Sequence, residues 1–457
     1  MSRSVPSASD ASLPPASSSV PHWLLPLHVL GVILIQSTSF AAWFIVPIIA
    51  KKYFDADARH VVILTAAPVV LFCLSIFWND LYSRLRFKPY AAIYWIVASL
   101  PLAFTSLATN FWLLAIPQVI ASIGGAAYHP AAGDLLRSLY PAKSRGRVYS
   151  IIWGSSMLVS GGIGYLLGEV QNANPDSFRV FMPALVLAQL LGVGVLTFLA
   201  TRTGHDARRV LATKRGEHPV RALLYPVVHM KEVLREDPAF TRYEGAYMTY
   251  GVGWMIATAL LPNLVTDKLN LPYDTIANST HVPYQIAVVA MILPAGWLLD
   301  RLGAVRSTAL SFFLLTFYPM GLMFARGHAD LLAISIFYGI AHAGASMGWM
   351  LGPVAFAPTP RRAAQYVSIH ATLVGVRGTI FQALGITLYE IFHAFDIPLA
   401  LAAIAHVWSA YQMWRLHAVM KKSGTTGRIE SRTPRPTPTP SVTPQADPLA
   451  GPPPARS

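Results

Sequence analysis

One arginine, Arg377, lies well inside a long apolar stretch, and it is the first residue whose chemistry needs an explanation. An Arg side chain in the middle of a membrane costs roughly 2.5–3.5 kcal/mol even on a lenient scale, so it needs a partner or a wet cavity. Its planar guanidinium can bind a carboxylate or phosphate of a substrate through two hydrogen bonds. The alternative is a structural pair with a neighbouring helix, for which Glu244 is a candidate. His370 precedes Arg377 by seven residues, about two helical turns, and therefore shares its helix face.

Four further apolar stretches carry polar or aromatic residues, which in three of them share one helix face because they are spaced by three or four residues. The four sets are His28 with the run Gln36, Ser37, Thr38 and Ser39; Gln118, Ser122, Gly125 and His129; Glu244, Tyr247, Gly251 and Trp254; and Tyr338, His342, Ala345 and Trp349. Each set alone could make polar contacts between helices. The four together favour a cavity that binds a substrate.

Glu244 and the histidines in these stretches are the candidate proton carriers. An unperturbed His titrates near pH 6.5, within the physiological range. The histidines concerned are His28, His129, His342 and His370. A second interpretation of Glu244 stays open, because it follows Arg242 near a helix start and can complement the helix dipole.

Motifs for other chemistries are absent from the sequence. It contains no G-x-x-x-x-G-K-[ST] loop for ATP and no H-x-x-x-H or H-x-x-E-H pattern. Cys73 is the only cysteine, which excludes a cysteine ligand cluster and an intrachain disulfide. We therefore expect no enzymatic activity, no cofactor and no metal, with transport driven by a proton or other ion gradient.

The elements that hold these residues are membrane-spanning helices. Of the 457 residues, 54% are hydrophobic and 12% are charged, against about 45–50% and about 25% in soluble domains. The apolar residues fall in blocks of about twenty, the length of a helix that crosses the hydrocarbon layer. We predict twelve spans: 23–49, 60–78, 90–108, 111–131, 147–168, 178–200, 241–263, 281–299, 306–325, 330–354, 366–389 and 395–418. This excludes a soluble enzyme, a secreted domain and a partner nucleic acid.

The longest polar stretch divides the spans six and six. We predict an all-α membrane protein with two six-helix bundles, over residues 23–200 and 241–418, joined by a cytoplasmic central loop over 201–240. Residues 1–22 and 419–457 are predicted to be disordered tails, since they are rich in Ser, Pro, Thr and Ala and cannot bury enough apolar surface. We expect a monomer in a lipid bilayer.

Lys and Arg predict the orientation. With both termini in the cytoplasm, the cytoplasmic segments hold 28 of the 35 basic residues and the outer loops hold six. Because basic residues concentrate on the cytoplasmic side, this orientation is favoured in the cytoplasmic membrane of a bacterium, its inner membrane. The excess of positive charge thus reports topology rather than an anionic macromolecular partner.

A short motif between predicted spans 8 and 9 has the composition of a conformational gate. It runs over residues 296–306 with the sequence GWLLDRLGAVR. Gly296 and Gly303 would let a short turn bend sharply. Asp300 could accept hydrogen bonds from helix N-terminal amides, and Arg301 could pair across an interface.

These residues closely resemble the G-x-L-x-D-R-x-G-x-x-R signature of the Major Facilitator Superfamily. A degenerate copy between spans 2 and 3 keeps Leu81 and Arg84 of the signature, but Asn79, Ser83 and Arg86 replace Gly, Asp and Gly. The resemblance covers about residues 23–418. It implies two six-helix bundles in which spans 1, 4, 7 and 10 line a central cavity that opens alternately to each side.

The sequence departs from that family pattern in two spans. Many proton-coupled members have an R-x-x-x-G pattern in span 4, where this chain has Gln118 and Ser122. Span 5 is rich in Gly but lacks the Gly-Pro of antiporters, so its small residues are interpreted as close helix packing. The stretch that ends in His129-Pro130 is similar to span 4 of fosmidomycin-resistance-type exporters, which favours export.

We therefore expect a secondary active transporter for a small organic solute, anionic or drug-like, that works by alternating access with proton coupling. A non-transporting membrane sensor or scaffold on the same fold is the alternative. The sites that would bind the solute or the proton are Arg377, His370, Glu244, Gln36, Gln118, His129, Trp254, His342 and Trp349.

Overall fold

A computed structural model describes residues 21–140, 144–205, 230–358 and 363–422. Most of both predicted tails and part of the predicted central loop lie outside these residues, as does the side chain of Asp300 within its helix. Within the described residues every regular element is helical, which confirms the all-α prediction. A short helical stretch at 230–236 occupies the end of the predicted central loop.

The first half of the described chain contains six long helical segments, several of them interrupted by a π or 3₁₀ turn. In chain order they are α1 (Leu24–Val32) with η1 (Ile33–Ser37) and α2 (Thr38–Lys52); α3 (Ala58–Val70) with η2 (Leu71–Leu74) and α4 (Ser75–Arg84); α5 (Phe87–Tyr94) with η3 (Trp95–Ser99), α6 (Leu100–Phe104) and η4 (Thr105–Leu107); α7 (Phe111–Gly125) with α8 (Tyr128–Leu139); α9 (Arg145–Ala173); and, after η5 (Pro175–Ser177), α10 (Phe178–Arg202).

The second half repeats this organisation with six more long segments. They are α13 (Pro238–Asn263) with η6 (Leu264–Lys268); α14 (Tyr273–Ile276) with η7 (Ala277–His281) and α15 (Val282–Leu302); α16 (Ala304–Leu315) with α17 (Phe317–Phe324); α18 (His328–Phe356); α19 (Ala363–Phe392); and α20 (Asp396–Lys422). Each predicted span thus corresponds to one segment of the described chain. The bounds of the two predicted bundles stay a prediction.

Ten of these segments are long and apolar enough to cross a membrane. The segment over 58–84 has a shorter apolar part, Ala58–Leu74, and α20 is more polar. Most helices are longer than predicted, because polar side chains prolong them beyond the apolar stretch. Thus α4 runs to Arg84 rather than to residue 78, and α20 runs to Lys422 rather than to residue 418.

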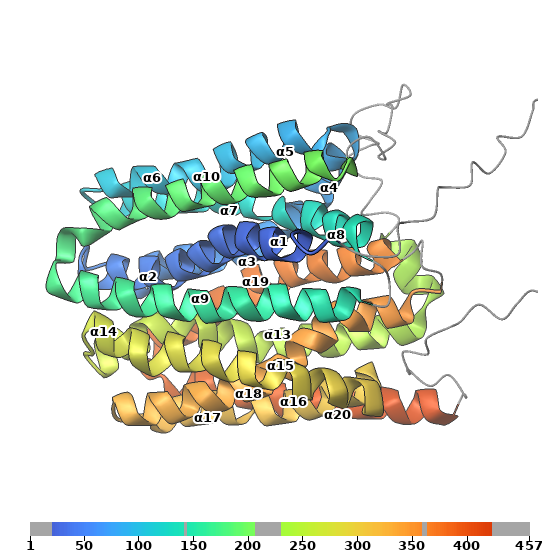
Figure 1. Ribbon diagram of the computed structural model, residues 1–457. Helices are drawn as coiled ribbons and strands as arrows, with labels where there is room; N and C mark the ends of the chain where they lie inside the picture. Colours follow the sequence, from blue (N-terminus) through green and yellow to red (C-terminus); the bar gives the residue numbers. More distant parts are fainter. Residues whose placement is uncertain (1–20, 141–143, 206–229, 359–362, 423–457) are drawn as a thin grey trace, which may run out of the picture.

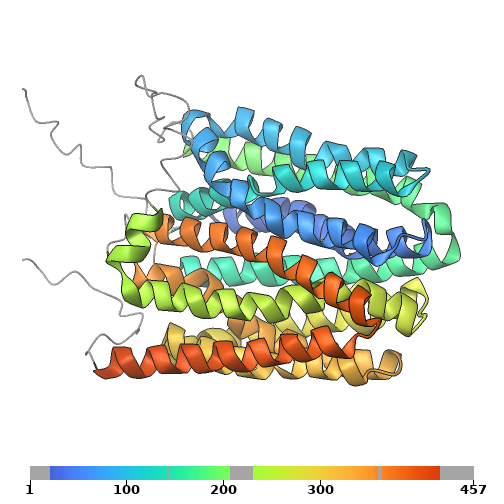
Figure 2. The same cartoon turned by 180° about the vertical axis from the view of Figure 1, so that it is seen from behind.

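The two halves lie side by side with their long axes roughly parallel (Figures 1 and 2). They meet along two seams, α9 with α14, η7 and α15, and α19 with α3, η2 and α4. Glycines bring the helices together at both. A Cβ on Gly164 of α9 would lie 2.3 Å from His281 Cδ2, and one on Gly378 of α19 would lie 2.7 Å from Val69 Cγ1. The Gly-rich span 5 therefore packs closely, as predicted.

The apolar core differs between the two ends of the molecule. We call the end where α1 begins and α20 finishes the terminal end, and the other the opposite end. At the opposite end one apolar cluster takes in residues of both halves, including Ile45, Leu64, Leu260 and Leu399. At the terminal end each half has its own apolar cluster. The cluster of the first half contains Tyr90, and the cluster of the second half contains Phe312.

Polar contacts between the halves reinforce the opposite end. Lys51 Nζ lies 2.9 Å from a carboxylate oxygen of Asp267, and Arg59 pairs with Glu390. Lys52 Nζ donates to the Leu271 carbonyl oxygen at 2.7 Å. In this conformation the halves are therefore joined at the opposite end, while their terminal-end cores are separate.

Candidate functional site

Contact between α13 and α19 brings an acid and a histidine together inside the second half. The Asp237 carboxylate caps α13 by accepting from the Phe240 amide at 2.9 Å, which sets the start of the helix. Glu244 follows in the second turn, and His370 Nδ1 lies 2.9 Å from both of its carboxylate oxygens. Glu244 is 3% exposed and His370 is 1% exposed. Since an ionised carboxylate only accepts, Nδ1 carries the hydrogen in this pair.

The other ring nitrogen of His370 has a different environment. Nε2 is buried and has no hydrogen-bond partner among the described residues. The ring lies edge-on to Tyr247, at 4.8 Å between centroids, and edge-on to Trp349 at 5.3 Å. With Nδ1–H directed at the carboxylate, a neutral ring has its lone pair on Nε2, and a proton could bind there.

Arg377 lies two turns further along α19 and is 1% exposed. Its Nη1 donates to the Tyr247 carbonyl oxygen at 2.6 Å, and the guanidinium lies over the Tyr250 ring, 5.4 Å from the centroid. Its stem passes over Gly251, where a Cβ would lie 2.2 Å from Arg377 Cδ. No ion pair within 4 Å joins it to Glu244 in the described part of the chain, although the two charges interact at longer range.

The predicted faces of spans 7 and 10 meet each other within the second half. Trp254 Nε1 donates to the Tyr338 hydroxyl at 2.8 Å, and the Trp254 ring stacks on His342 at 5.9 Å. The Tyr284 hydroxyl lies 2.9 Å from His342 Nδ1. Trp254 also stacks on Tyr250, which links these rings to Arg377.

Aromatic side chains of both halves surround a small apolar core between α2, α3, α13, α18 and α19. Val69, Met255 and Val374 form that core. Four partly buried rings pack around it: Trp43, Trp254, Trp349 and Phe381. We call these four rings the central aromatic cluster. Because Trp349 also contacts His370, the cluster adjoins the Glu244–His370 pair.

Predicted site residues of the first half lie apart from that pair. Gln36 is within hydrogen-bonding reach of Tyr128. His129 is exposed and its ring lies 5.2 Å from that of Phe72. Gln118 is buried, and its Oε1 has no partner among the described residues. Within the described chain, no hydrogen bond, ion pair or ring contact joins these three to Glu244, His370 or Arg377.

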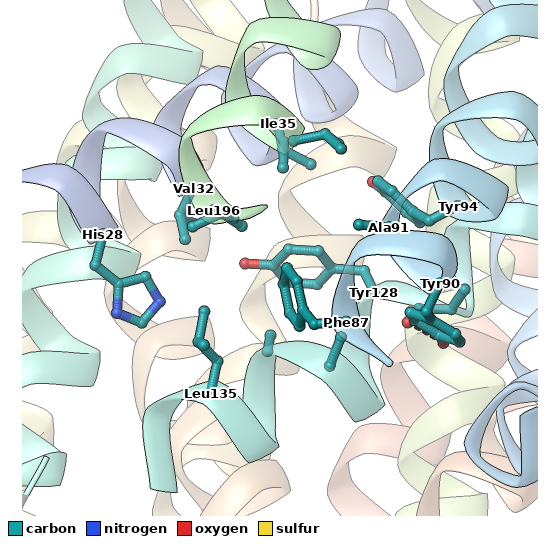
Figure 3. Close-up of a pocket in the computed structure, with 14 residues that line it drawn as sticks. His28, Val32, Ile35, Phe87, Tyr90, Ala91, Tyr94, Tyr128, Leu135 and Leu196 are labelled. Carbon is teal, nitrogen blue, oxygen red and sulfur yellow. Dashed lines mark hydrogen bonds between the residues drawn. The ribbon is translucent and has the colours of Figure 1, made fainter. Parts of the chain in front are cut away.

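A small cavity lies within the first half, between α1, α5, α8 and α10 (Figure 3). His28 and Leu135 line one side, Tyr90 and Tyr94 line the other, and the Tyr128 ring lies between them. His28 Nδ1 is 3.2 Å from the Tyr140 hydroxyl. The cavity measures about 30 Å³, room for one or two water molecules, so it is too small for an organic solute.

Part of the predicted gate motif differs from the expectation. Gly303 ends α15 with φ 78°, a backbone region that favours glycine, so the chain bends there as predicted. Gly296 instead lies inside α15 and bends nothing, because the helix continues through it. Arg301 lies over the Trp297 ring at 4.0 Å, and Arg84 pairs with Asp80 at 2.6 Å. Among the described residues, each therefore contacts a residue of its own helix.

Two polar contacts at the seams were not anticipated from the sequence. The Thr65 hydroxyl donates to Gln382 Oε1 at 2.9 Å between α3 and α19. His281 Nε2 lies 3.2 Å from the Ser160 carbonyl oxygen between η7 and α9. The partners are more than a hundred positions apart, so no local spacing pattern could have paired them.

Comparisons with known proteins agree with this architecture. A family model described as the Major Facilitator Superfamily matches residues 29–388. The chain is similar in structure to a POT family transporter in complex with 5-aminolevulinic acid, with a TM-score of 0.70, 11% identity and coverage of 88% of this chain and 96% of that chain. It is also similar to a mutant peptide transporter POT in complex with alafosfalin, with a TM-score of 0.69, 12% identity and coverage of 87% and 95%. No match was found among curated protein sequences.

Proposed function

The chain belongs to the Major Facilitator Superfamily and is a multi-pass secondary transporter, and we propose that it couples proton entry to the export of a small anionic or drug-like organic solute. Transport rather than enzymatic chemistry follows from the family. The direction, the coupling ion and the solute class are the proposed parts. The preference for export comes from the sequence around His129-Pro130.

The buried Glu244–His370 pair is the observation that carries proton coupling. Ionisable residues inside spanning helices are rare and mark ion pathways or proton relays. Here the two side chains share one hydrogen-bonded site at 2.9 Å, and His370 Nε2 is left without a partner in the described chain. A proton taken up at Nε2 would leave an imidazolium beside the carboxylate. Trp349 contacts the His370 ring and belongs to the central aromatic cluster. The new positive charge on His370 would therefore act on a solute bound at that cluster.

Arg377 carries a positive charge close to the Glu244–His370 pair. Its full burial and its bond to the Tyr247 carbonyl support the structural interpretation over direct contact with a solute in this conformation. The guanidinium and the Glu244 carboxylate attract each other at longer range, without a direct ion pair among the described residues.

We propose that the terminal end faces the cytoplasm, since most Lys and Arg residues of the predicted loops belong to that end. With that orientation, the cluster joining both halves closes the outer side, and the solute reaches the central aromatic cluster from the cytoplasm. A second conformation, opened at the opposite end, would complete the cycle of alternating access.

Everted membrane vesicles that are energised to pump protons inward test the proposal. Acridine orange reports the pH gradient while a panel of organic acids and antimicrobials is added one compound at a time. We expect at least one compound to dissipate the gradient in vesicles that contain the protein and not in control vesicles. If no compound on the panel does so, proton-coupled export of this solute class is wrong.

The coupling residue is tested with Glu244→Gln, which keeps the side-chain shape but removes the charge. We expect it to lower proton release on addition of the active compound at least tenfold, while exchange of labelled for unlabelled compound continues. Glu169→Gln is the matched control, because Glu169 is exposed on α9. Proton release by Glu244→Gln at the wild-type rate would remove the pair from the coupling site.

A further inference from the structure

His281 is a buried histidine that the coupling site does not use. It ends η7, a π-helical turn within the segment that faces the first half. Such turns are rare and occur often at functional positions. Its side chain is 8% exposed, and it lies on the seam between η7 and α9 rather than inside one half.

Three groups of the first half hold its ring. Nε2 lies 3.2 Å from the Ser160 carbonyl oxygen and 3.2 Å from the Ser160 hydroxyl. The ring stacks on Phe44 of α2, at 4.4 Å between centroids and 23° between planes. Its edge faces the backbone of α9, because position 164 is glycine. An imidazole of one half thus fills a site built by the other.

The protonation state in this conformation follows from the acceptor. A carbonyl oxygen can only accept, so Nε2 carries a hydrogen and donates to Ser160. Nδ1 makes no hydrogen bond to any described residue, so a second proton would bind there and create an imidazolium on the seam.

Among the described residues, no carboxylate forms an ion pair with the His281 ring. The elements packed around His281 are α2, α9, α14, α15 and α18. In the parts of these elements nearest the opposite end, the titratable or charged groups are Lys51 and Lys52 on α2, Tyr165 and Glu169 on α9, Tyr273 and Asp274 on α14, Tyr284 on α15, and His328, Asp330, Tyr338 and His342 on α18. Within the described residues, none of them makes an ion pair or a hydrogen bond with His281.

We propose that His281 is a proton-binding site that controls closure of the opposite end. Neutral His281 stabilises the contact between the halves through its hydrogen bond to Ser160 and its stacking on Phe44. A proton on Nδ1 turns it into a largely buried cation with no ion-pair partner among the described residues, and its desolvation cost falls when the seam parts and more water reaches the ring. Acid therefore favours the conformation that is open at the opposite end. The inference rests on the proposed function only in that two conformations interconvert.

The second seam offers an internal comparison. There Thr65 and Gln382 bond across α3 and α19, and neither side chain titrates. Both seams are fastened by side-chain hydrogen bonds, but of these two hydrogen-bonded contacts only the one at His281 contains a group that titrates near neutral pH. A variant at either seam should loosen closure, whereas only a variant at His281 should remove the pH response.

Double electron–electron resonance measures this without any solute. Spin labels are attached to Ala173→Cys on α9 and Ala329→Cys on α18, two exposed positions at the opposite end, in a Cys73→Ala background in nanodiscs. Between pH 8 and pH 5.5, we expect the ratio of long to short distances to rise by about fivefold or more; one proton can change it by at most about tenfold per pH unit.

His281→Gln keeps an amide N–H for the Ser160 carbonyl but cannot become a cation, so the ratio should become independent of pH. His328→Gln is the control, because His328 is an exposed histidine at the same end. Gly164→Ala, which displaces the ring, should give the long distances already at pH 8. Glu244→Gln should keep the wild-type pH response, which separates this proposal from the coupling site. A pH response unchanged in His281→Gln, or absent in the wild type, would overturn it.

Discussion

The contact between Gly251 and Arg377 allows a direct test of how the buried guanidinium is held. A Cβ added at Gly251 would lie 2.2 Å from Arg377 Cδ and 2.8 Å from Nε. Arg377 is 1% exposed and its Nη1 is bound to the Tyr247 carbonyl, so the stem has little room to move. We expect Gly251→Ala to destabilise the protein by about 1–3 kcal/mol, the usual cost of overpacking a core.

Gly245→Ala is the matched control on the same helix. A Cβ there meets no atom within 4 Å, and the position is exposed. Since Ala is the better helix former, this change should be neutral or stabilise by up to about 1 kcal/mol. Free energies of unfolding are measured by far-ultraviolet circular dichroism in mixed detergent micelles with increasing dodecyl sulfate.

A double-mutant cycle assigns the cost to the contact. In an Arg377→Ala background the clashing atoms are gone, so Gly251→Ala should cost less than about 0.5 kcal/mol there. Equal costs in both backgrounds would show that Gly251 is needed for some other reason. A neutral Gly251→Ala in the wild-type background would contradict the buried position of Arg377 itself.

The remaining predictions concern the orientation and the closed end. Cysteines placed at Gly216 and Gly451 in a cysteine-free background should resist an impermeant thiol reagent in intact cells and react after lysis, because both positions are predicted to be cytoplasmic. Asp267→Asn removes the ion pair with Lys51, which is partly exposed and worth about 0.2–1 kcal/mol, so spin labels should report only a small rise in the open conformation, and less at high salt. Thr65→Val breaks the hydrogen bond to α19 and leaves a buried amide without its partner, so it should lower the free energy of unfolding by about 1–3 kcal/mol.

Much of the site could be predicted within single helices. The spacing of Glu244, Tyr247 and Gly251 places them on one face, and that face does meet the face of His370 and Arg377. Which face meets which could not be predicted, since the pairing depends on packing between segments about 126 positions apart. The sequence therefore allowed Glu244 as a partner for Arg377, whereas the carboxylate binds His370.

His281 was not predicted as a functional residue from the sequence. It stands at the first position of a predicted span, beside Val282 and Pro283, with no polar repeat around it. Its proposed role depends on a π turn and on a glycine of α9, neither of which an apolar pattern predicts. For Gly296 the prediction was made and was wrong. Glycine suggests a turn there, but α15 continues through this position as a helix.

The glycines of the two seams also affect the route by which a hydrophobic molecule can reach the interior of the protein. At Gly164 on α9 and Gly378 on α19, a side chain from the other half lies against the helix backbone, so neither seam leaves a gap there for a lipid tail or a flat hydrophobic compound. A compound dissolved in the bilayer therefore has no sideways entrance at these levels in this conformation. In the proposed cycle it reaches the central aromatic cluster from the terminal end instead, where the apolar cores of the halves are separate.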